Sequence, residues 1–326
     1  MTKLVLFTGL LMFIGLGCNL DQKSDNKMSQ TESEKKTGKK EKNDEKKDEK
    51  KDKDADKTGK KGNDEKKDAV NNDVSYSENV AILGTWEMPT MLKEISGICW
   101  FENNKIAAVQ DESGIIFIYD LVSKKIEKEI PFGAKGDYEG IAVTPKAFYV
   151  LRADGTVIEV PKSKGQVKEH DTHLSVKDDT EGICYDAKTQ QLLISLKATS
   201  GTAKSNKHIY SFNIATKKLS AEPVFSIDTR DQIFETATNS KPKDSFHPSE
   251  ISIHPKTGEM YLTGGANSSL LVLNNTAKAN YYTLLNPADF NQPEGIAFSP
   301  EGELYIATEG VKDPGKIFKI NLINKP

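Results

Sequence analysis

The chain lacks several features that would assign it to a common class of enzyme. Its 326 residues contain no Gly-x-Ser-x-Gly elbow, no P-loop and no dinucleotide-binding glycine motif. Acyl-enzyme, NTPase and nicotinamide chemistry therefore find no support in it. The folded part also lacks any window with a 3.6-residue hydrophobic period, which argues against a helical domain. There are only three cysteines and five histidines, and no cysteine stands near a histidine pair as a zinc site would require.

A long hydrophobic run is missing as well. The run from Leu4 to Leu16 follows Lys3 and covers 13 residues, too few to span a bilayer as a stable helix. This arrangement is typical of a signal peptide over residues 1–17. The run ends at Gly17-Cys18 and resembles a bacterial lipobox, although Gly15 stands where that motif usually has leucine. The resemblance implies cleavage before Cys18 and lipidation of that residue; an ordinary secretory signal is the alternative.

Aromatic residues are absent from the next segment. Between Asp21 and Asp73 the chain has 17 lysines and 16 acidic residues, and the first aromatic residue is Tyr76. Such a composition cannot bury enough apolar surface to offset the entropy of ordering, so we expect a disordered tether over residues 18–75. The charges of this segment are mixed, and the rest of the chain is net acidic, so nucleic acid is not expected as a partner. The expected location is the cell envelope, with a lipid anchor in the outer membrane and the folded domain outside the cytoplasm.

A short motif is repeated five times in residues 76–326. A serine or glutamate opens an apolar strand, usually followed by glycine and isoleucine, and the glycine positions lie 43, 42, 68 and 45 residues apart. The copies begin at Ser96, Glu139, Glu181, Ser249 and Glu294. A period of about 40–45 residues is the signature of a β-propeller, in which each repeat is one blade.

Turn residues divide each repeat into short strands, which predicts an all-β propeller of five four-stranded blades. The last repeat supplies only three strands. We expect Val80–Glu87 to provide the fourth, so that an N-terminal strand closes the ring and removes its open edge. In the third repeat the outer strand is predicted over Ala221–Ile227. Six blades are the alternative, because the third repeat carries the only spare material.

The phrases GDYEGIAV (136–143), DTEGICYD (179–186), HPSEISIHPKTGEMYL (247–262) and QPEGIAFSPEGELYIATEG (292–310) resemble the SdiA-regulated family of bacterial propellers. The resemblance covers about Ile95 to Leu322. It implies an exported or lipid-anchored propeller but no particular chemistry. The same motif is similar to that of phytase-like and lactonase-like propellers, so the resemblance keeps hydrolysis open. Cys99 and Cys184 fall at equivalent positions of two non-adjacent blades, which predicts two free thiols rather than a disulfide.

Carboxylates recur at the start of the repeats. The first strand of each blade lines the central channel, so we expect these side chains to meet at one channel mouth. Converging carboxylates repel one another unless cations or protons intervene, and oxygen ligands favour Ca²⁺ or Mg²⁺. The candidate metal ligands are Glu139, Glu181, Glu294, Asp137 and Asp179. Structural bracing of one blade against the next is the equally weighted alternative.

A second set of charged residues lies at the ends of the second strands. Asp111, Lys197 and Glu309 fall at one position of the repeat, and Arg152 lies one step away. This set suits a polar or anionic ligand, or it forms salt bridges between blades. Two functions follow: a non-catalytic propeller that binds a ligand or partner with a divalent cation near its channel, or a metal-dependent phosphoesterase or lactonase. In the second, Asp111 or Glu309 would be the general base, and Lys197 or Arg152 would stabilise the anion.

Overall fold

The computed structural model describes residues 79–198, 205–235, 246–323 and 325. The signal peptide, Cys18 and the charged tether lie outside the described residues, so these remain predictions from sequence. Within the described ranges, no helix is both long and apolar enough to cross a bilayer.

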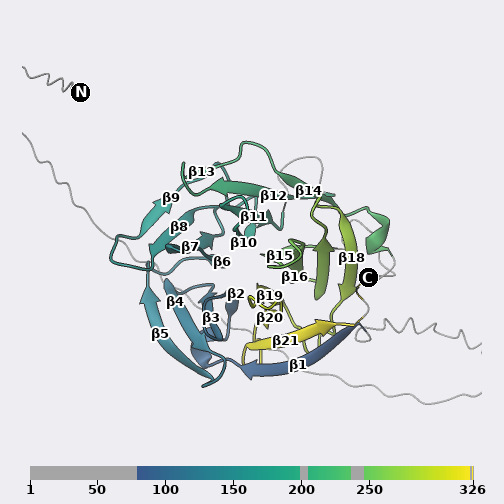
Figure 1. The fold of residues 1–326 in the computed structure, drawn as a ribbon, viewed down its shortest axis with the longest axis horizontal. Helices are drawn as coiled ribbons and strands as arrows, with labels where there is room; N and C mark the ends of the chain where they lie inside the picture. The colour runs from purple at the N-terminus through teal and green to yellow at the C-terminus, as the bar shows by residue number, and fades with distance from the viewer. Residues whose placement is uncertain (1–78, 199–204, 236–245, 324, 326) are drawn as a thin grey trace, which may run out of the picture. The chain divides into compact units, whose positions relative to one another are not determined.

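The described residues form five antiparallel sheets arranged as blades around a common centre (Figure 1). Blade 1 is β2–β5, blade 2 is β6–β9, blade 3 is β10–β14, blade 4 is β15–β18, and blade 5 is β19–β21 with β1. The strands are β1 (Val80–Glu87), β2 (Ile95–Trp100), β3 (Lys105–Gln110), β4 (Ile115–Asp120), β5 (Lys125–Pro131), β6 (Tyr138–Val143), β7 (Ala147–Arg152), β8 (Val157–Pro161), β9 (Lys168–His170), β10 (Thr180–Asp186), β11 (Gln191–Leu196), β12 (Asn206–Asn213), β13 (Lys218–Leu219), β14 (Phe225–Asp228), β15 (Pro248–Ile253), β16 (Met260–Gly264), β17 (Ser269–Leu273), β18 (Ala279–Leu284), β19 (Pro293–Phe298), β20 (Leu304–Thr308) and β21 (Lys316–Leu322). Two short 3₁₀ helices, η1 (Thr90–Leu92) and η2 (Gln232–Phe234), complete the described elements. The prediction of five blades is confirmed.

Blade 3 departs from the predicted pattern at its outer edge. The expected strand over Ala221–Ile227 begins only at Phe225, as β14, a separate two-residue strand, β13, precedes the predicted range, and both pair with β12. Pro223 lies between them and has no backbone N–H to donate to a ladder, which accounts for the break.

The ring is closed by the first strand of the domain, as expected. β1 pairs antiparallel with β21 along its length, from Val80 opposite Leu322 to Glu87 opposite Lys316. Figure 1 shows the two strands, blue and yellow, side by side at the outer edge of blade 5. Closure leaves the inner strands β2, β6, β10, β15 and β19 as neighbours around the centre.

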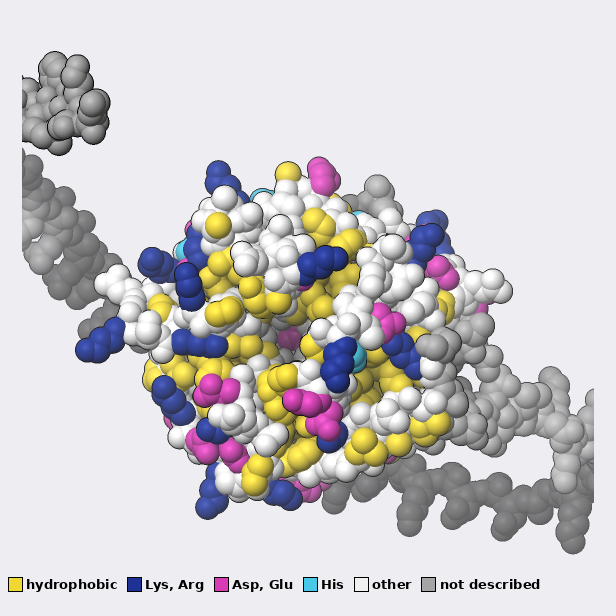
Figure 2. Space-filling view, in the orientation of Figure 1, with side chains coloured by type: hydrophobic (Ala, Val, Ile, Leu, Met, Phe, Trp, Pro, Cys, Tyr) yellow, Lys and Arg dark blue, Asp and Glu magenta, His cyan; other side chains and the backbone are white. Residues whose placement is uncertain are grey.

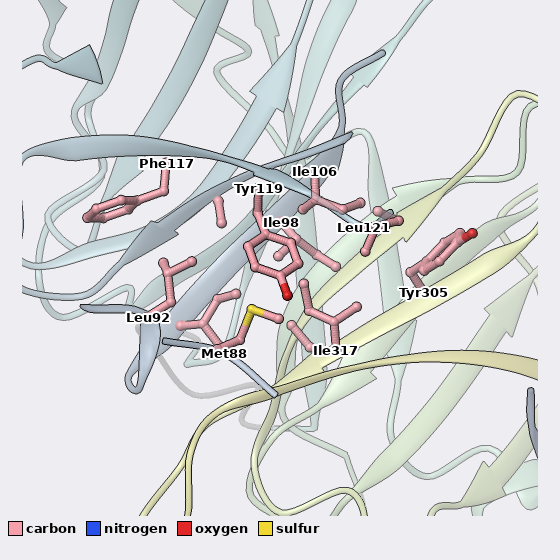
Figure 3. Close-up of a cluster of buried hydrophobic side chains, with 13 residues drawn as sticks. Met88, Leu92, Ile98, Ile106, Phe117, Tyr119, Leu121, Tyr305 and Ile317 are labelled. Atoms are coloured by element: carbon pink, nitrogen blue, oxygen red, sulfur yellow. The ribbon is translucent and has the colours of Figure 1, made fainter. Parts of the chain in front are cut away.

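The core is divided into five hydrophobic clusters, one between each pair of neighbouring blades. Figure 3 shows the cluster between blades 1 and 5, where Ile98 and Tyr119 face Ile317. Each cluster contains the isoleucine that follows the repeated motif, and each of these side chains is 1% exposed: Ile98, Ile141, Ile183, Ile251 and Ile296. Burying one such side chain stabilises the fold by about 1.5–3 kcal/mol. The repeated motif therefore contributes one core side chain to every contact between blades.

Candidate functional site

Every inner strand carries a register irregularity at the same position. In blade 2, Tyr138 pairs with Arg152 and Gly140 pairs with Leu151, so Glu139 has no partner in the ladder. The same holds for the residues that open the other four copies, which are Ser96, Glu181, Ser249 and Glu294. A β-bulge of this kind re-aims the side chain of the extra residue. The fold therefore repeats one bulge five times and directs five polar side chains to one end of the ring.

The two serines use this position to join neighbouring blades. Ser96 Oγ donates to the carbonyl oxygen of Tyr138 in blade 2, and Ser249 Oγ donates to that of Pro293 in blade 5, each at 2.6 Å. Both side chains are buried. For these two copies the structure supports the bracing interpretation.

Glu181 forms an ion pair that lies at the mouth of the ring. Its Oε1 is 2.7 Å from Lys197 Nζ, and the two side chains are 5% and 36% exposed. Burial raises the pKa of Glu181 to about 8 even though Lys197 opposes the shift. Burial lowers the pKa of Lys197 while Glu181 raises it, and the net shift is upward. The ammonium of Lys207 is also held nearby, where it donates to the backbone carbonyl of Lys197 at 2.5 Å.

Among the described residues, no ion-pair partner of this kind accompanies the other carboxyl groups of the mouth. Burial raises the pKa of Glu139 to about 9, and the charges of Glu181 and Asp137 add to the shift. Burial also raises the pKa of Glu294. The pKa of Glu309 rises to about 7, first through burial and then through the charges of Glu294 and Asp111. Burial and mutual repulsion thus favour the protonated form of each of these carboxyl groups, as expected in an electronegative pocket.

The second set of predicted residues lies beside the first. Backbone hydrogen bonds hold Asp111, Lys197 and Glu309 beside the mouth. Each of their N–H groups donates to a residue two positions before the motif, as Lys197 N does to Asp179 O at 2.9 Å. The side chain of Gln292 also donates to the carboxylate of Glu309. Burial raises the pKa of Asp111. These residues therefore belong to the same electronegative mouth.

Three predicted residues lie at its margin or away from it. Arg152 is turned outward, where its guanidinium bonds Asp154 and Glu169 at 3.0 and 3.3 Å. Asp137 is exposed. Asp179 is partly buried, has a positive φ of 52°, and contributes to the pKa shifts of both Lys197 and Lys207. Arg152 therefore supplies no positive charge to the mouth.

Glu250 is the residue whose importance the sequence did not predict. It stands where the other four copies have glycine, and its side chain is 0% exposed. Its Oε1 accepts hydrogen bonds from the backbone N–H of Ile183 (2.7 Å) and of Ile251 (2.9 Å). Its Oε2 is buried and has no hydrogen-bond partner. The signal in the sequence was the replacement of glycine by glutamate in a single repeat.

The opposite end of the channel has a different character. A cavity of about 320 Å³ is lined by the later residues of the inner strands, including Cys99, Cys184, Trp100 and Tyr185. In Figure 2, hydrophobic side chains border a hollow at the centre of the ring. Both cysteines are free thiols, as predicted. The channel therefore has a carboxylate mouth at one end and a mainly apolar mouth at the other.

The carboxylates do not form a preassembled metal cluster. Among the residues that the structure describes, no group of three or more His, Cys, Asp or Glu side chains is placed to hold one metal ion. Any cation at the carboxylate mouth would therefore be held by fewer acidic side chains, together with backbone oxygens or water.

Fold and site together define a five-bladed β-propeller with an electronegative channel mouth. The chain belongs to the SdiA-regulated family, whose model matches residues 75–318. No curated protein is significantly similar to it in sequence.

The solved structures that this chain resembles are distant in sequence. A glutaminyl cyclase from Myxococcus xanthus is 14% identical with a TM-score of 0.52, over 74% of this chain and 96% of that one. A streptogramin B lyase is 16% identical with a TM-score of 0.45, over 75% and 98% of the two chains. An aldose sugar dehydrogenase from Streptomyces coelicolor, in a PQQ-bound form, is 13% identical with a TM-score of 0.47, over 75% and 98%. At these identities the likeness extends to the fold alone.

Proposed function

We propose that this chain is an envelope-anchored propeller that binds a positively charged ligand, a divalent cation among the candidates, at its carboxylate mouth. The observation that carries the proposal is the set of raised carboxyl pKa values at one end of the channel, about 9, 8 and 7 for Glu139, Glu181 and Glu309. A ligand cation would relieve the repulsion that these groups now relieve by holding protons.

Binding at such a mouth would release protons. Near neutral pH, Glu139 and Glu181 are largely protonated, and a bound cation favours their charged forms. Glu181 already has the Lys197 ammonium as a partner at 2.7 Å, which leaves Glu139 and Glu294 as the strongest candidates for ligand contact.

Isothermal titration of the folded protein tests the proposal with three probes: CaCl₂, MgCl₂ and the organic dication putrescine. We expect at least one of them to bind with proton release, and the double variant Glu139→Gln/Glu294→Gln to lose that binding. The control is Glu303→Gln, which removes a carboxylate that pairs with Lys319 at 2.6 Å on blade 5. The absence of heat from all three probes, or unchanged binding by the double variant, would refute the proposal.

A metal-dependent hydrolase is the second candidate, and it rests on Glu309. A carboxyl group with a pKa of about 7, whose charge interacts with the Lys197 ammonium, suits a general base at neutral pH. Turnover of a phosphoester or lactone panel in the presence of Ca²⁺ or Mg²⁺, lost in Glu309→Gln, would replace the binding hypothesis with this one.

The anchor is proposed from the sequence alone. A lipid on Cys18 followed by about 55 tether residues would hold the propeller some 40 Å from the membrane surface. Labelling of cells with a fatty-acid analogue should mark the protein, and Cys18→Ala should abolish the label. Labelling that persists in the variant would contradict the anchor.

A further inference from the structure

The centre of the ring is built from four glycines and one glutamate. Gly97, Gly140, Gly182 and Gly295 occupy the position that Glu250 holds in blade 4. The inner strands approach closely there: a Cβ added to Gly97 would lie 2.7 Å from Gly140 Cα, and one added to Gly182 would lie 2.7 Å from Glu250 Cα. The glycine backbones therefore pass close to one another, and the Glu250 side chain lies among them.

The two oxygens of this carboxylate have different surroundings. Oε1 crosses from blade 4 to blade 3 and accepts two backbone N–H groups, as described above. Oε2 faces the positions that Cβ atoms of Gly97 and Gly140 would take, at 3.2 and 3.0 Å, and has no hydrogen-bond partner. Leaving a buried acceptor without a partner destabilises the fold, and more so when the group is charged. Such an oxygen in a fully buried position points to a missing partner.

We propose that the Oε2 atom of Glu250 is the innermost ligand of a single dehydrated metal cation bound on the axis of the propeller. This inference rests on the proposed function, since the ion would enter through the carboxylate mouth, and it narrows the ligand from any positive charge to a metal ion. The step is an exchange: the O–H bond of the protonated carboxyl breaks, the proton leaves to solvent, and the oxygen coordinates the ion.

The space around Oε2 excludes larger cations. A Cβ added to Gly97 or Gly140 would lie 3.2 or 3.0 Å from Oε2, and the Gly140 Cβ would also lie 3.1 Å from the Glu181 carbonyl oxygen. Carboxylate and backbone carbonyl oxygens are the ligands of hard cations such as Ca²⁺. An alkylammonium group would need the room that the close-packed strands occupy. A site of one carboxylate and backbone oxygens also agrees with the lack of a three-acid cluster among the described side chains.

The charged groups around Glu250 fit a site linked to the mouth. Burial holds the pKa of Glu250 well above its ordinary range, the N–H groups of Ile251 and Ile183 oppose the shift, and the charges of Glu181 and Glu294 add to it. Below the glycine ring, Cys99 and Cys184 have raised pKa values, first through burial and then through Glu250. A cation that enters from the carboxylate mouth would therefore meet Glu294 and Glu181 before it reaches the axis.

Thermal melts at constant ionic strength test the inference. The salts are NaCl, KCl, CaCl₂ and MgCl₂, with tetramethylammonium chloride as the cation that is too large. At pH 8 we expect at least one metal salt to raise the Tm of the wild-type protein by about 3 °C or more over tetramethylammonium. At pH 6 the rise should be smaller, because protons compete for Oε2. Equal Tm values in all five salts would overturn the proposal.

Two variants assign the effect to Glu250. Glu250→Gln keeps an oxygen for the two N–H donors but cannot carry a negative charge. We expect the Tm of this variant to be the same with every cation. The control Glu303→Gln should respond like the wild-type protein. If Glu250→Gln does not fold, Glu250→Gly, which restores the glycine of the other repeats, takes its place. Persistence of the metal effect in whichever variant folds would overturn the proposal.

A second measurement needs no variant. Titration calorimetry with the effective metal in buffers of different ionisation enthalpy should give release of about one proton per ion at pH 7. Zero proton release would count against Glu250 as the ligand. If Glu250 proves not to bind a metal ion while cations still bind at Glu139 and Glu294, the axial site is refuted and the proposed function stands. If the wild-type protein binds no cation at all, both proposals are refuted.

Discussion

Within the described part of the chain, the Lys197 ammonium is the only cation that forms an ion pair with a mouth carboxylate, and it lies 2.7 Å from the nearly buried carboxylate of Glu181. One partner of this pair is half-exposed and the other is not, so the pair lies on the boundary between solvent and channel. Its contribution to stability should therefore depend on pH.

Replacement of Lys197 by methionine should destabilise the protein by about 1–3 kcal/mol at pH 9, where Glu181 would be left charged and buried. At pH 6 the loss should be smaller, because Glu181 then holds a proton. Lys217→Met is the matched control: Lys217 pairs with Glu159 at 2.7 Å, and the pKa of Glu159 lies below its ordinary range. Guanidinium unfolding at both pH values measures the difference, and a Lys197→Met loss equal at the two pH values would contradict the prediction.

Glu139 should make the fold less stable as pH rises. Its pKa is about 9 in the folded state against about 4.5 in the unfolded chain, so the folded state binds more protons between these values. Stability linked to this group is thus complete below about pH 4.5 and is lost as pH rises towards 9. Glu139→Gln should flatten the decline in unfolding free energy between pH 5 and 9. Parallel pH profiles for the variant and the wild-type protein would show that Glu139 titrates normally.

The buried serines should contribute to stability and not to ligand binding. Ser96→Ala and Ser249→Ala each remove a hydrogen bond to the neighbouring blade, which should cost about 1 kcal/mol or somewhat more. Ser249→Ala should cost more, because the Ser249 hydroxyl also forms a hydrogen bond with Thr263 Oγ1 at 3.0 Å, in which it accepts the Thr263 proton. Denaturant unfolding tests this against the exposed control Ser163→Ala. A loss of cation binding with unchanged stability would assign the serines to the site instead.

Gly140 should not tolerate a side chain while Glu250 is present. A Cβ there would lie 3.0 Å from Glu250 Oε2 and 3.1 Å from the Glu181 carbonyl oxygen, so Gly140→Ala should cost about 1–3 kcal/mol. In a Glu250→Gly background the cost should be smaller, because one of these contacts is gone. A double-mutant cycle measures the coupling, and additive free energies would show that the two residues do not compete for the axial space.

The sequence predicted the blades, the closing strand and the free thiols because each depends on a repeated local pattern. It predicted the carboxylate mouth because equivalent strand positions meet at one end of a ring. It did not predict the bulge, which is visible only when both paired strands are known. Arg152 was assigned to the mouth, but Asp154 two residues later holds its guanidinium outside. The role of Glu250 was not predicted, because only the assembled ring brings its side chain close to Gly97, Gly140 and Gly182 of three other blades.

Ring closure by β1 also sets the order in which the domain becomes complete. Val80, the first residue of β1, pairs with Leu322, near the end of the chain, so the last blade cannot form until nearly the entire domain has been made. Contacts between such distant residues slow folding, since the entropy of the long loop is lost before the pairing compensates it. During synthesis, β1 is made before the other strands of the domain and remains unpaired until β21 is available. The unfinished domain is thus exposed to proteases and holding chaperones for longer than a protein built from local hairpins alone.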